Sequence, residues 1–225
     1  RLTGVLVATW MEDGMAAEAY PGAQEFLPRQ RDPTHLRRAA AQCRGCDLYR
    51  SATQVVFGNG PTPAELMLVG EQPGDSEDRE GEPFVGPAGE LLSQALENVG
   101  IDREQVYVTN AVKHFKWEAR GKRRIHKKPS LREVRACTPW LSAELEVVQP
   151  RLLVCLGVTA ATAVFGKTVR LKDYRGLFTR SALGPLAFVT THPSALLRMR
   201  GRDGWEQEYR RFLTELKTVK AKLTA

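Results

Sequence analysis

Three polar motifs follow apolar segments of this chain, and their side chains are of types that bind or transform ligands. Residues 70–75 read Gly-Glu-Gln-Pro-Gly-Asp and follow the apolar segment 65–69. Asn110 follows the segment 106–109, and His192-Pro193-Ser194 comes soon after the segment 186–190. A carboxylate can orient water or stabilise a cation, a carboxamide both donates and accepts hydrogen bonds, and an imidazole can stabilise a developing anion.

The apolar segments are predicted to be strands, with helices between them. The predicted strands are 65–69, 106–112, 152–156 and 186–190. The predicted helices are 32–43, 87–99, one that begins at Ser130 with a capping box to Glu133, one that ends at Ala163, and one that begins near Asp203. This alternation predicts an α/β fold, a three-layer α/β/α sandwich around a mainly parallel four-stranded sheet. Ligands of such sheets bind beyond the carboxyl ends of the strands, so we expect the polar motifs to form one site.

A strongly basic segment follows Asn110. Its cations are Lys113, Lys116, Arg120, Lys122, Arg123, Arg124, Lys127 and Lys128, with the acid Glu118 among them. The whole chain carries a formal net charge of +7, with 33 basic and 26 acidic residues. A loop of this kind is an electrostatic footprint for phosphate, and the alternative is an ordinary solvated loop. Charge alone does not decide between the two.

The chain has four cysteines, Cys43, Cys46, Cys137 and Cys155. The first two have Cys-x-x-Cys spacing, and the other two lie far along the chain, in a predicted helix and a predicted strand. Four thiolates can hold zinc or an iron–sulfur cluster, and the dispersed spacing disfavours zinc. Buried core thiols are the alternative for the second pair, and a redox pair is a third interpretation of the first.

Composition bounds the rest of the molecule. The 225 residues, 42% of them hydrophobic, suit a single globular domain, which we expect to span residues 22–225. Residues 1–21 are expected to be a poorly organised N-terminal extension. The sequence shows neither a long apolar run nor the pattern of a secretory signal, so we expect a cytoplasmic monomer that has no membrane partner.

Several strings of residues, taken in order, resemble one family of DNA-repair enzymes. Residues 70–78 resemble the first motif of the iron–sulfur (family 4) uracil-DNA glycosylases, and residues 83–89 resemble the segment that follows it. Residues 109–113 are similar to the family's base-reading segment, and residues 192–198 to its closing motif. The resemblance implies a uracil-DNA glycosylase-like fold, uracil-containing DNA as the partner, uracil as a ligand, and a [4Fe-4S] cluster. Its implied ligands are Cys43, Cys46, Cys137 and Cys155.

The resemblance also implies catalytic roles. Phe84 would stack on a uracil base flipped out of the DNA, and Asn110 would read the amide edge of that base. His192 would donate a hydrogen bond to the uracil anion as it develops. Glu71 or Asp75 would orient water or stabilise the sugar cation. Taken alone, Phe84 would be a core or loop-tip aromatic, Asn110 a turn residue at a strand end, and His192 a structural residue. Glu71 and Asp75 would be ordinary turn or cap residues.

Further positions complete the implied site. Gln72, Gly74 and Ser194 would contribute to the substrate pocket. Leu197 and Arg198 would lie at the rim that faces DNA and hold the distorted strand, because apolar wedges often fill an unstacked base step. The plain alternative for these last two residues is the start of a helix after Pro193.

Two departures from ordinary family 4 enzymes resemble the UdgX subgroup. Gln72 stands where alanine is usual, and the segment after Lys113 is expanded to include residues 122–126, Lys-Arg-Arg-Ile-His. Members of this subgroup excise uracil and then become covalently joined to the DNA through the histidine of that loop. The resemblance therefore implies that His126 takes the place of water.

The basic loop would serve this reaction in two ways. Its cations Lys122, Arg123 and Arg124 would contact phosphates, and the positive charge around His126 would disfavour protonation of the imidazole, which must be neutral to attack C1′ of the sugar. The alternatives are a conventional multiple-turnover uracil-DNA glycosylase and a non-enzymatic protein that binds uracil-containing or abasic DNA.

Overall fold

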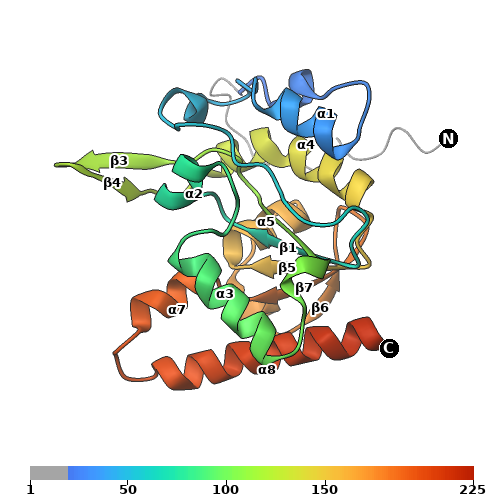
Figure 1. The fold of residues 1–225 in the computed structure, drawn as a ribbon, viewed down its shortest axis with the longest axis vertical. Coiled ribbons are helices and arrows are strands. Elements are labelled where there is room, and N and C mark those ends of the chain that lie inside the picture. The colour runs from blue at the N-terminus through green and yellow to red at the C-terminus, as the bar shows by residue number, and fades with distance from the viewer. Residues whose placement is uncertain (1–19) are drawn as a thin grey trace.

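A computed structural model describes residues 20–225 of the chain. The prediction for residues 1–21 therefore lies, except for its last two residues, outside the described residues. The described part is built around one five-stranded sheet, with helices on both faces and a small two-stranded hairpin at one side (Figure 1).

The central sheet has the strand order β2-β1-β5-β7-β6. Its strands are β1 (Leu66–Gly70), β2 (Val106–Asn110), β5 (Leu152–Leu156), β6 (Phe178–Arg180) and β7 (Leu186–Thr190). The strands β2, β1, β5 and β7 pair in parallel in that order, and β6 pairs antiparallel with β7 at the edge. Every residue of β1, β2 and β5 is buried, because helices cover both faces of the sheet. The predicted mainly parallel sheet is confirmed. The predicted count of four strands is one too low, because the short edge strand β6 was not predicted.

Helices form the outer two layers. One face carries α1 (Pro33–Ala40), α4 (Leu131–Val148) and α5 (Val158–Phe165), and the other carries α3 (Pro87–Asn98), α7 (Pro193–Met199) and α8 (Trp205–Thr224). The short helices α2 (Asp75–Glu80) and α6 (Leu171–Tyr174) and the 3-10 turns Ala23–Phe26, Asp47–Arg50 and Arg103–Gln105 fill the connections. The predicted three-layer sandwich is thus confirmed. Among residues 20–225, no helix is both long and apolar enough to cross a membrane.

The basic segment is a β-hairpin and not the loop that we predicted. β3 (Trp117–Arg120) pairs antiparallel with β4 (Arg123–His126), and the register places Trp117 opposite His126. Gly121 forms the turn with a φ of 59°, a backbone conformation that glycine adopts without steric cost. The hairpin projects from the body of the molecule beside α2 (Figure 1).

Candidate active site

A cavity of about 720 Å³ lies at the carboxyl ends of the parallel strands. Glu71 follows β1, Asn110 ends β2, Leu156 ends β5, and His192 follows β7 by two residues. All four line the cavity, together with His126 at the end of β4. The polar motifs that the sequence places after separate strands therefore surround one space, as the parallel topology requires.

Glycines make room for the floor of this cavity. A Cβ on Gly70 would lie 2.3 Å from Asn110 Oδ1 and 2.7 Å from Phe84 Cζ, so only glycine allows both side chains to approach the end of β1. A Cβ on Gly89 would lie 1.7 Å from the carbonyl oxygen of Phe84, and Phe84 itself has a φ of 59°. The tight turn before α3 thus holds Phe84 in a strained conformation against the cavity, a pattern that clusters at ligand sites.

His192 is held as a neutral hydrogen-bond donor. Its Nδ1 accepts the backbone N–H of Ser194 at 3.1 Å, so the ring proton belongs on Nε2. Burial, with nearby Arg198 and His126, lowers the pKa of His192 to about 4, which keeps the ring neutral at physiological pH. The ring lies against that of Phe84, with centroids 6.2 Å apart and 28° between the planes. Ser194 lines the cavity too, and its hydroxyl lies 2.8 Å from His192 Nδ1.

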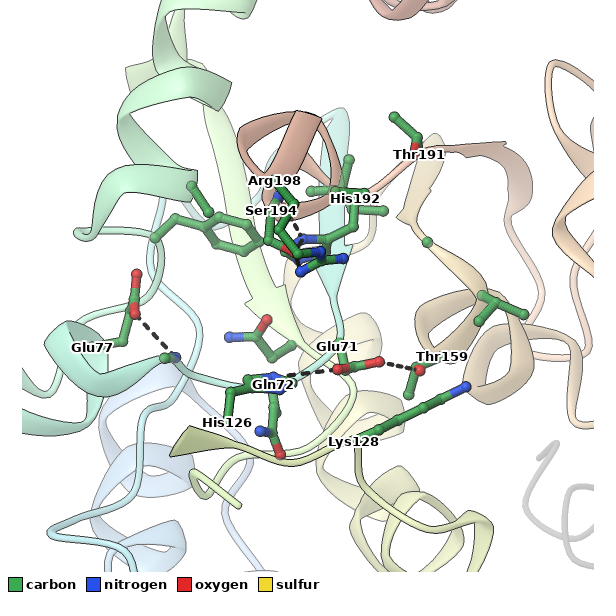
Figure 2. A pocket seen from close by; sticks show the side chains of 18 of the residues that line it. Glu71, Gln72, Glu77, His126, Lys128, Thr159, Thr191, His192, Ser194 and Arg198 are labelled. Atoms are coloured by element: carbon green, nitrogen blue, oxygen red, sulfur yellow. Dashed lines mark hydrogen bonds and ion pairs between the residues drawn. The ribbon is translucent and has the colours of Figure 1, made fainter. Parts of the chain in front are cut away.

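Glu71 connects two elements across the cavity. Its Oε1 lies 3.3 Å from His126 Nε2, and its Oε2 accepts a hydrogen bond from the hydroxyl of Thr159 on α5 (Figure 2). The side chain of His126 is 48% exposed and that of Glu71 is 22% exposed, so the pair can meet a ligand from solvent. A carboxylate and an imidazole thus face each other where a reacting group would bind.

The pKa of His126 lies below its ordinary value. Burial is the main cause and nearby Arg198 adds to it, while the Glu71 carboxylate acts in the opposite direction. We had expected the cations of the basic segment to keep this ring neutral. The structure instead assigns the effect to partial burial and to a cation on α7, across the cavity from the hairpin.

Gln72 connects the two roots of the hairpin. Its Nε2 donates to the carbonyl oxygens of Lys116 and Lys127, both at 3.1 Å, and its Oε1 accepts the amide of Lys116 at 3.2 Å. Lys127 N also donates to Lys116 O at 2.9 Å. Gln72 lines the cavity as the sequence suggested, yet its amide is occupied in holding the hairpin. Gly74, also at the cavity, is the N-cap of α2 and donates its amide to Glu77 Oε2 at 3.0 Å.

Arg124 ties the hairpin to α2 and does not face solvent. It donates from Nε to Asp75 Oδ1 and from Nη1 to Asp78 Oδ2, both at 2.5 Å, and only 14% of its side chain is exposed. Asp75, which we considered as a catalytic carboxylate, is not among the residues that line the cavity. Hydrogen bonds from Arg79 and Arg124 occupy its carboxylate. Glu77 of the same motif does line the cavity, but its two oxygens accept the amides of Gly74 and Gly86. Among the described residues, Glu71 is therefore the first-motif carboxylate in position for chemistry.

The remaining predicted DNA contacts lie on two sides of the cavity. Lys122 and Arg123 lie at the turn of the hairpin, and both are exposed. Arg198 lines the cavity from α7, with Nη1 3.3 Å from Ser194 Oγ. Leu197 packs partly buried against the helix layer of α3 and α8 instead of lining the cavity.

The structure adds positioning residues that we did not predict. Lys113 and Glu144 form an ion pair with 1% and 0% of their side chains exposed, and Lys113 Nζ also donates to the carbonyl oxygen of Asn110 at 2.8 Å. Thr159 was also missed. It lies just beyond the carboxyl end of β5, where the parallel topology places a ligand site as it does for β1, β2 and β7.

The cysteines divide into a group of three and a separate one. Burial, together with the nearby thiols of Cys46 and Cys43, raises the pKa of Cys137 to about 12. Cys155 lies in the middle of the sheet, and burial is the cause that raises its pKa, without a contribution from another thiol. Within residues 20–225, no three His, Cys, Asp or Glu side chains surround a single-ion position. All four cysteines belong to the same core cluster, and none of the other three thiols contributes to the pKa shift of Cys155, so Cys155 as the fourth ligand of a shared centre stays a prediction.

The amide of Lys113 donates to Cys137 Sγ at 3.3 Å, and the indole of Trp140 donates to Cys43 Sγ at 3.3 Å. Such N–H donors are typical of the surroundings of metal-bound thiolates, and they tune the electronic properties of the bound centre. His114, the residue after Lys113, is buried, and burial lowers its pKa to about 4. A neutral imidazole, the form that binds metals, therefore directly follows the residue that contacts Cys137.

Comparison with known proteins places this fold and cavity in a family. Residues 57–217 match the profile of the Uracil DNA glycosylase superfamily. The chain is 34% identical over 172 residues to a type-4 uracil-DNA glycosylase of Sulfurisphaera tokodaii, which covers 72% of this chain and 74% of that protein. It is 38% identical over 163 residues to a type-4 uracil-DNA glycosylase of Thermotoga maritima, covering 72% of this chain and 81% of the relative. The chain belongs to the uracil-DNA glycosylase superfamily.

Proposed function

We propose that this protein excises uracil from DNA, in the service of DNA repair, and then joins its own His126 to the deoxyribose that remains. The first half of this proposal is supported by similarity to proteins named type-4 uracil-DNA glycosylases. The second half, a single-turnover reaction of the UdgX kind, is carried by one observation: His126 Nε2 lies 3.3 Å from Glu71 Oε1 at the cavity.

The cavity is suited to a flipped uracil. Enzymes that act on a base must extrude it from the duplex or take it from a single strand. The Asn110 carboxamide can both donate to and accept from the amide edge of uracil, and Phe84 offers an aromatic face. Both line the cavity, and the Lys113–Glu144 pair fixes the backbone that carries Asn110.

His192 is suited to the leaving group. When the N-glycosidic bond breaks, its electron pair leaves with N1 of uracil, and negative charge spreads to the carbonyl oxygens. A neutral imidazole with its proton on Nε2 donates to that charge without first losing or gaining a proton. The hydrogen bond from Ser194 N to Nδ1 holds the ring in this tautomer.

Bond formation then uses His126. The cation-like sugar would be stabilised by the Glu71 carboxylate, and a lone pair on a neutral ring nitrogen of His126 would form the new bond to C1′. The product is an imidazolium joined to the sugar, which loses its remaining ring proton to Glu71 or solvent, and the uracil anion takes a proton from solvent. Because His126 occupies the place beside Glu71, no water is positioned there to release the adduct.

An iron–sulfur cluster is part of this proposal as a structural group. Cys43, Cys46 and Cys137 would hold it, with His114 as the fourth ligand in place of Cys155. A four-iron cluster spreads its ligands more widely than a single ion does, which suits donors that come from three separate segments. The cluster would tie the loop after α1 to α4 and would take no part in bond cleavage.

The relatives' names favour a second candidate, a conventional multiple-turnover uracil-DNA glycosylase. One experiment separates the two. Protein is mixed with an oligonucleotide that contains a single uracil, and both free uracil and a heat-stable and detergent-stable protein–DNA band are quantified. Suicide trapping predicts one uracil and one adduct per protein molecule, and His126→Ser should abolish the adduct while water still permits some uracil release. Uracil release far beyond one equivalent without adduct would establish the conventional enzyme.

A further inference from the structure

We infer that Thr159 is a positioning residue that fixes which oxygen of the Glu71 carboxylate faces the reacting sugar. Thr159 Oγ1 donates a hydrogen bond to Glu71 Oε2, which leaves Oε1 directed toward His126 Nε2 at 3.3 Å (Figure 2). The two oxygens of one carboxylate are thereby assigned to two partners. This inference rests on the role proposed for Glu71.

The fold brings these residues together through adjacent strand ends. β1 and β5 are neighbouring parallel strands, Glu71 follows the last residue of β1, and Thr159 lies in the first turn of α5, directly after β5. The Glu71 backbone is fixed because its carbonyl oxygen accepts the amide of Val112 at 3.0 Å. The backbone does not fix the side chain, because the terminal torsion angle of glutamate has a broad distribution and the carboxylate rotates easily. The Thr159 hydroxyl supplies the missing restraint.

The Thr159 hydroxyl is well placed for this task. Thr159 is 4% exposed and lines the cavity, and its hydroxyl makes a charge-assisted hydrogen bond, a class about twice as strong as one between neutral groups. The same turn of α5 also sets His192: a Cβ on Gly157 would lie 3.2 Å from His192 Cβ, and Gly157 has a φ of 88°. The start of one helix therefore contacts Glu71 and lies close to His192, two groups that line the cavity.

The consequence concerns the breaking of that bond. As the bond from C1′ to uracil N1 breaks, its electron pair leaves with uracil and positive charge develops on the sugar. Glu71 Oε1 stabilises that charge whether His126 or water then supplies the electron pair for the new bond. Thr159 therefore controls the rate of uracil release as well as that of adduct formation, and it does so through Glu71.

The test compares Thr159→Val, which keeps the shape and removes the hydroxyl, with Thr159→Ser, which restores it. Thr162→Val is the matched control, because Thr162 is also buried in α5 but does not line the cavity. Uracil release and adduct formation are measured in the same samples over a range of concentrations of a uracil-containing oligonucleotide. Thr159→Val should lower the saturated rate about 10- to 100-fold with little change in the half-saturating DNA concentration, as expected for a lost hydrogen bond to a charged group. Thr159→Ser should recover most of the rate, and Thr162→Val should retain it.

A double variant shows whether the effect passes through Glu71. In a Glu71→Gln background, Thr159→Val should add little further loss, because residues that act as a unit are not additive. The inference is overturned if Thr159→Val keeps the full saturated rate, if Thr159→Ser is as slow as Thr159→Val, or if the losses of the two single variants multiply. Failure of the proposed function looks different: wild-type protein would release uracil over many turnovers without adduct, and the Thr159 comparison would then be read from uracil release alone.

Discussion

Arg124 on the hairpin is ion-paired with Asp78 of α2, with 2.5 Å between Nη1 and Oδ2, and the side chain of Asp78 is fully buried. A buried carboxylate needs this partner, because an unpaired charge in a protein interior is strongly unfavourable. Since His126 lies two residues beyond Arg124 on β4, the ion pair helps to fix the position of the His126 imidazole at the cavity.

Arg124→Met should therefore lower the free energy of unfolding by roughly 3 kcal/mol, the lower end of the range for breaking a buried pair. It should also slow adduct formation at saturating DNA, because His126 loses its fixed position. Chemical denaturation and the saturated crosslinking rate are the measurements. Arg123→Met is the matched control on the same strand. Wild-type crosslinking by Arg124→Met would show that the hairpin needs no such tie.

Lys122 and Arg123 should affect DNA binding and leave the chemistry unchanged. Each contact with a phosphate of a single strand contributes roughly −0.7 to the slope of log affinity against log salt, so replacing both residues by alanine should flatten that slope by about 1.4 units. Reversible binding is best measured in a His126→Ser background, where no adduct forms. A slope unchanged by the double substitution would mean that the tip of the hairpin stays in solvent.

The pH dependence of adduct formation should follow His126. In the proposed reaction its imidazole is active when neutral, and burial and Arg198 lower its pKa from 6.5, so the midpoint of the decline in rate at low pH should lie below pH 6.5. Arg198→Gln removes a cation that lowers the pKa values of His126 and His192, so both should rise and the decline should begin at higher pH. Arg200→Gln, an exposed position nearby, is the control. A decline at the same pH in Arg198→Gln would assign the effect to burial alone.

The cysteines should differ in their effect on bound iron. Cys137→Ala should yield protein with little iron and weak visible absorption, whereas Cys155→Ala should retain both, because the other thiols influence the pKa of Cys137 and not that of Cys155. His114→Cys should also retain iron, since it exchanges one ligand for another. Iron content and the visible spectrum are the measurements. Loss of iron in Cys155→Ala, with folding intact, would restore the four-cysteine ligand set.

Sequence patterns predicted the parts of the fold that repeat a physical rule over several residues. The strands β1, β5 and β7 appear as continuous apolar runs because both faces of the sheet are covered. The hairpin escaped prediction because its strands have four residues each and are largely exposed, so no core pattern marks them. β6 is shorter still, with three residues.

The site was predictable to the extent that topology determines it. Parallel strands bring Glu71, Asn110 and His192 to one end of the sheet whatever the intervening sequence is. The ion-pair partner of a charged side chain is harder to predict, because the two residues of such a pair can lie far apart in the chain. Arg124 appeared to be one more phosphate-binding cation, and its partner Asp78 lies 46 residues away. The spacing of Cys155 likewise gave no sign that its strand lies in the centre of the sheet.

The two roots of the hairpin lie one hydrogen bond apart, since Lys127 N donates to Lys116 O at 2.9 Å and Gln72 joins both. A chain segment that leaves and re-enters a fold at the same point can be deleted and the ends rejoined by a tight turn, without disturbing the sheet or α4. The presence of His126 is thus separable from the architecture that binds uracil. A covalent trap and a turnover enzyme would then differ by an insertion of about ten residues, a change that a scaffold of this kind tolerates readily at an exposed turn.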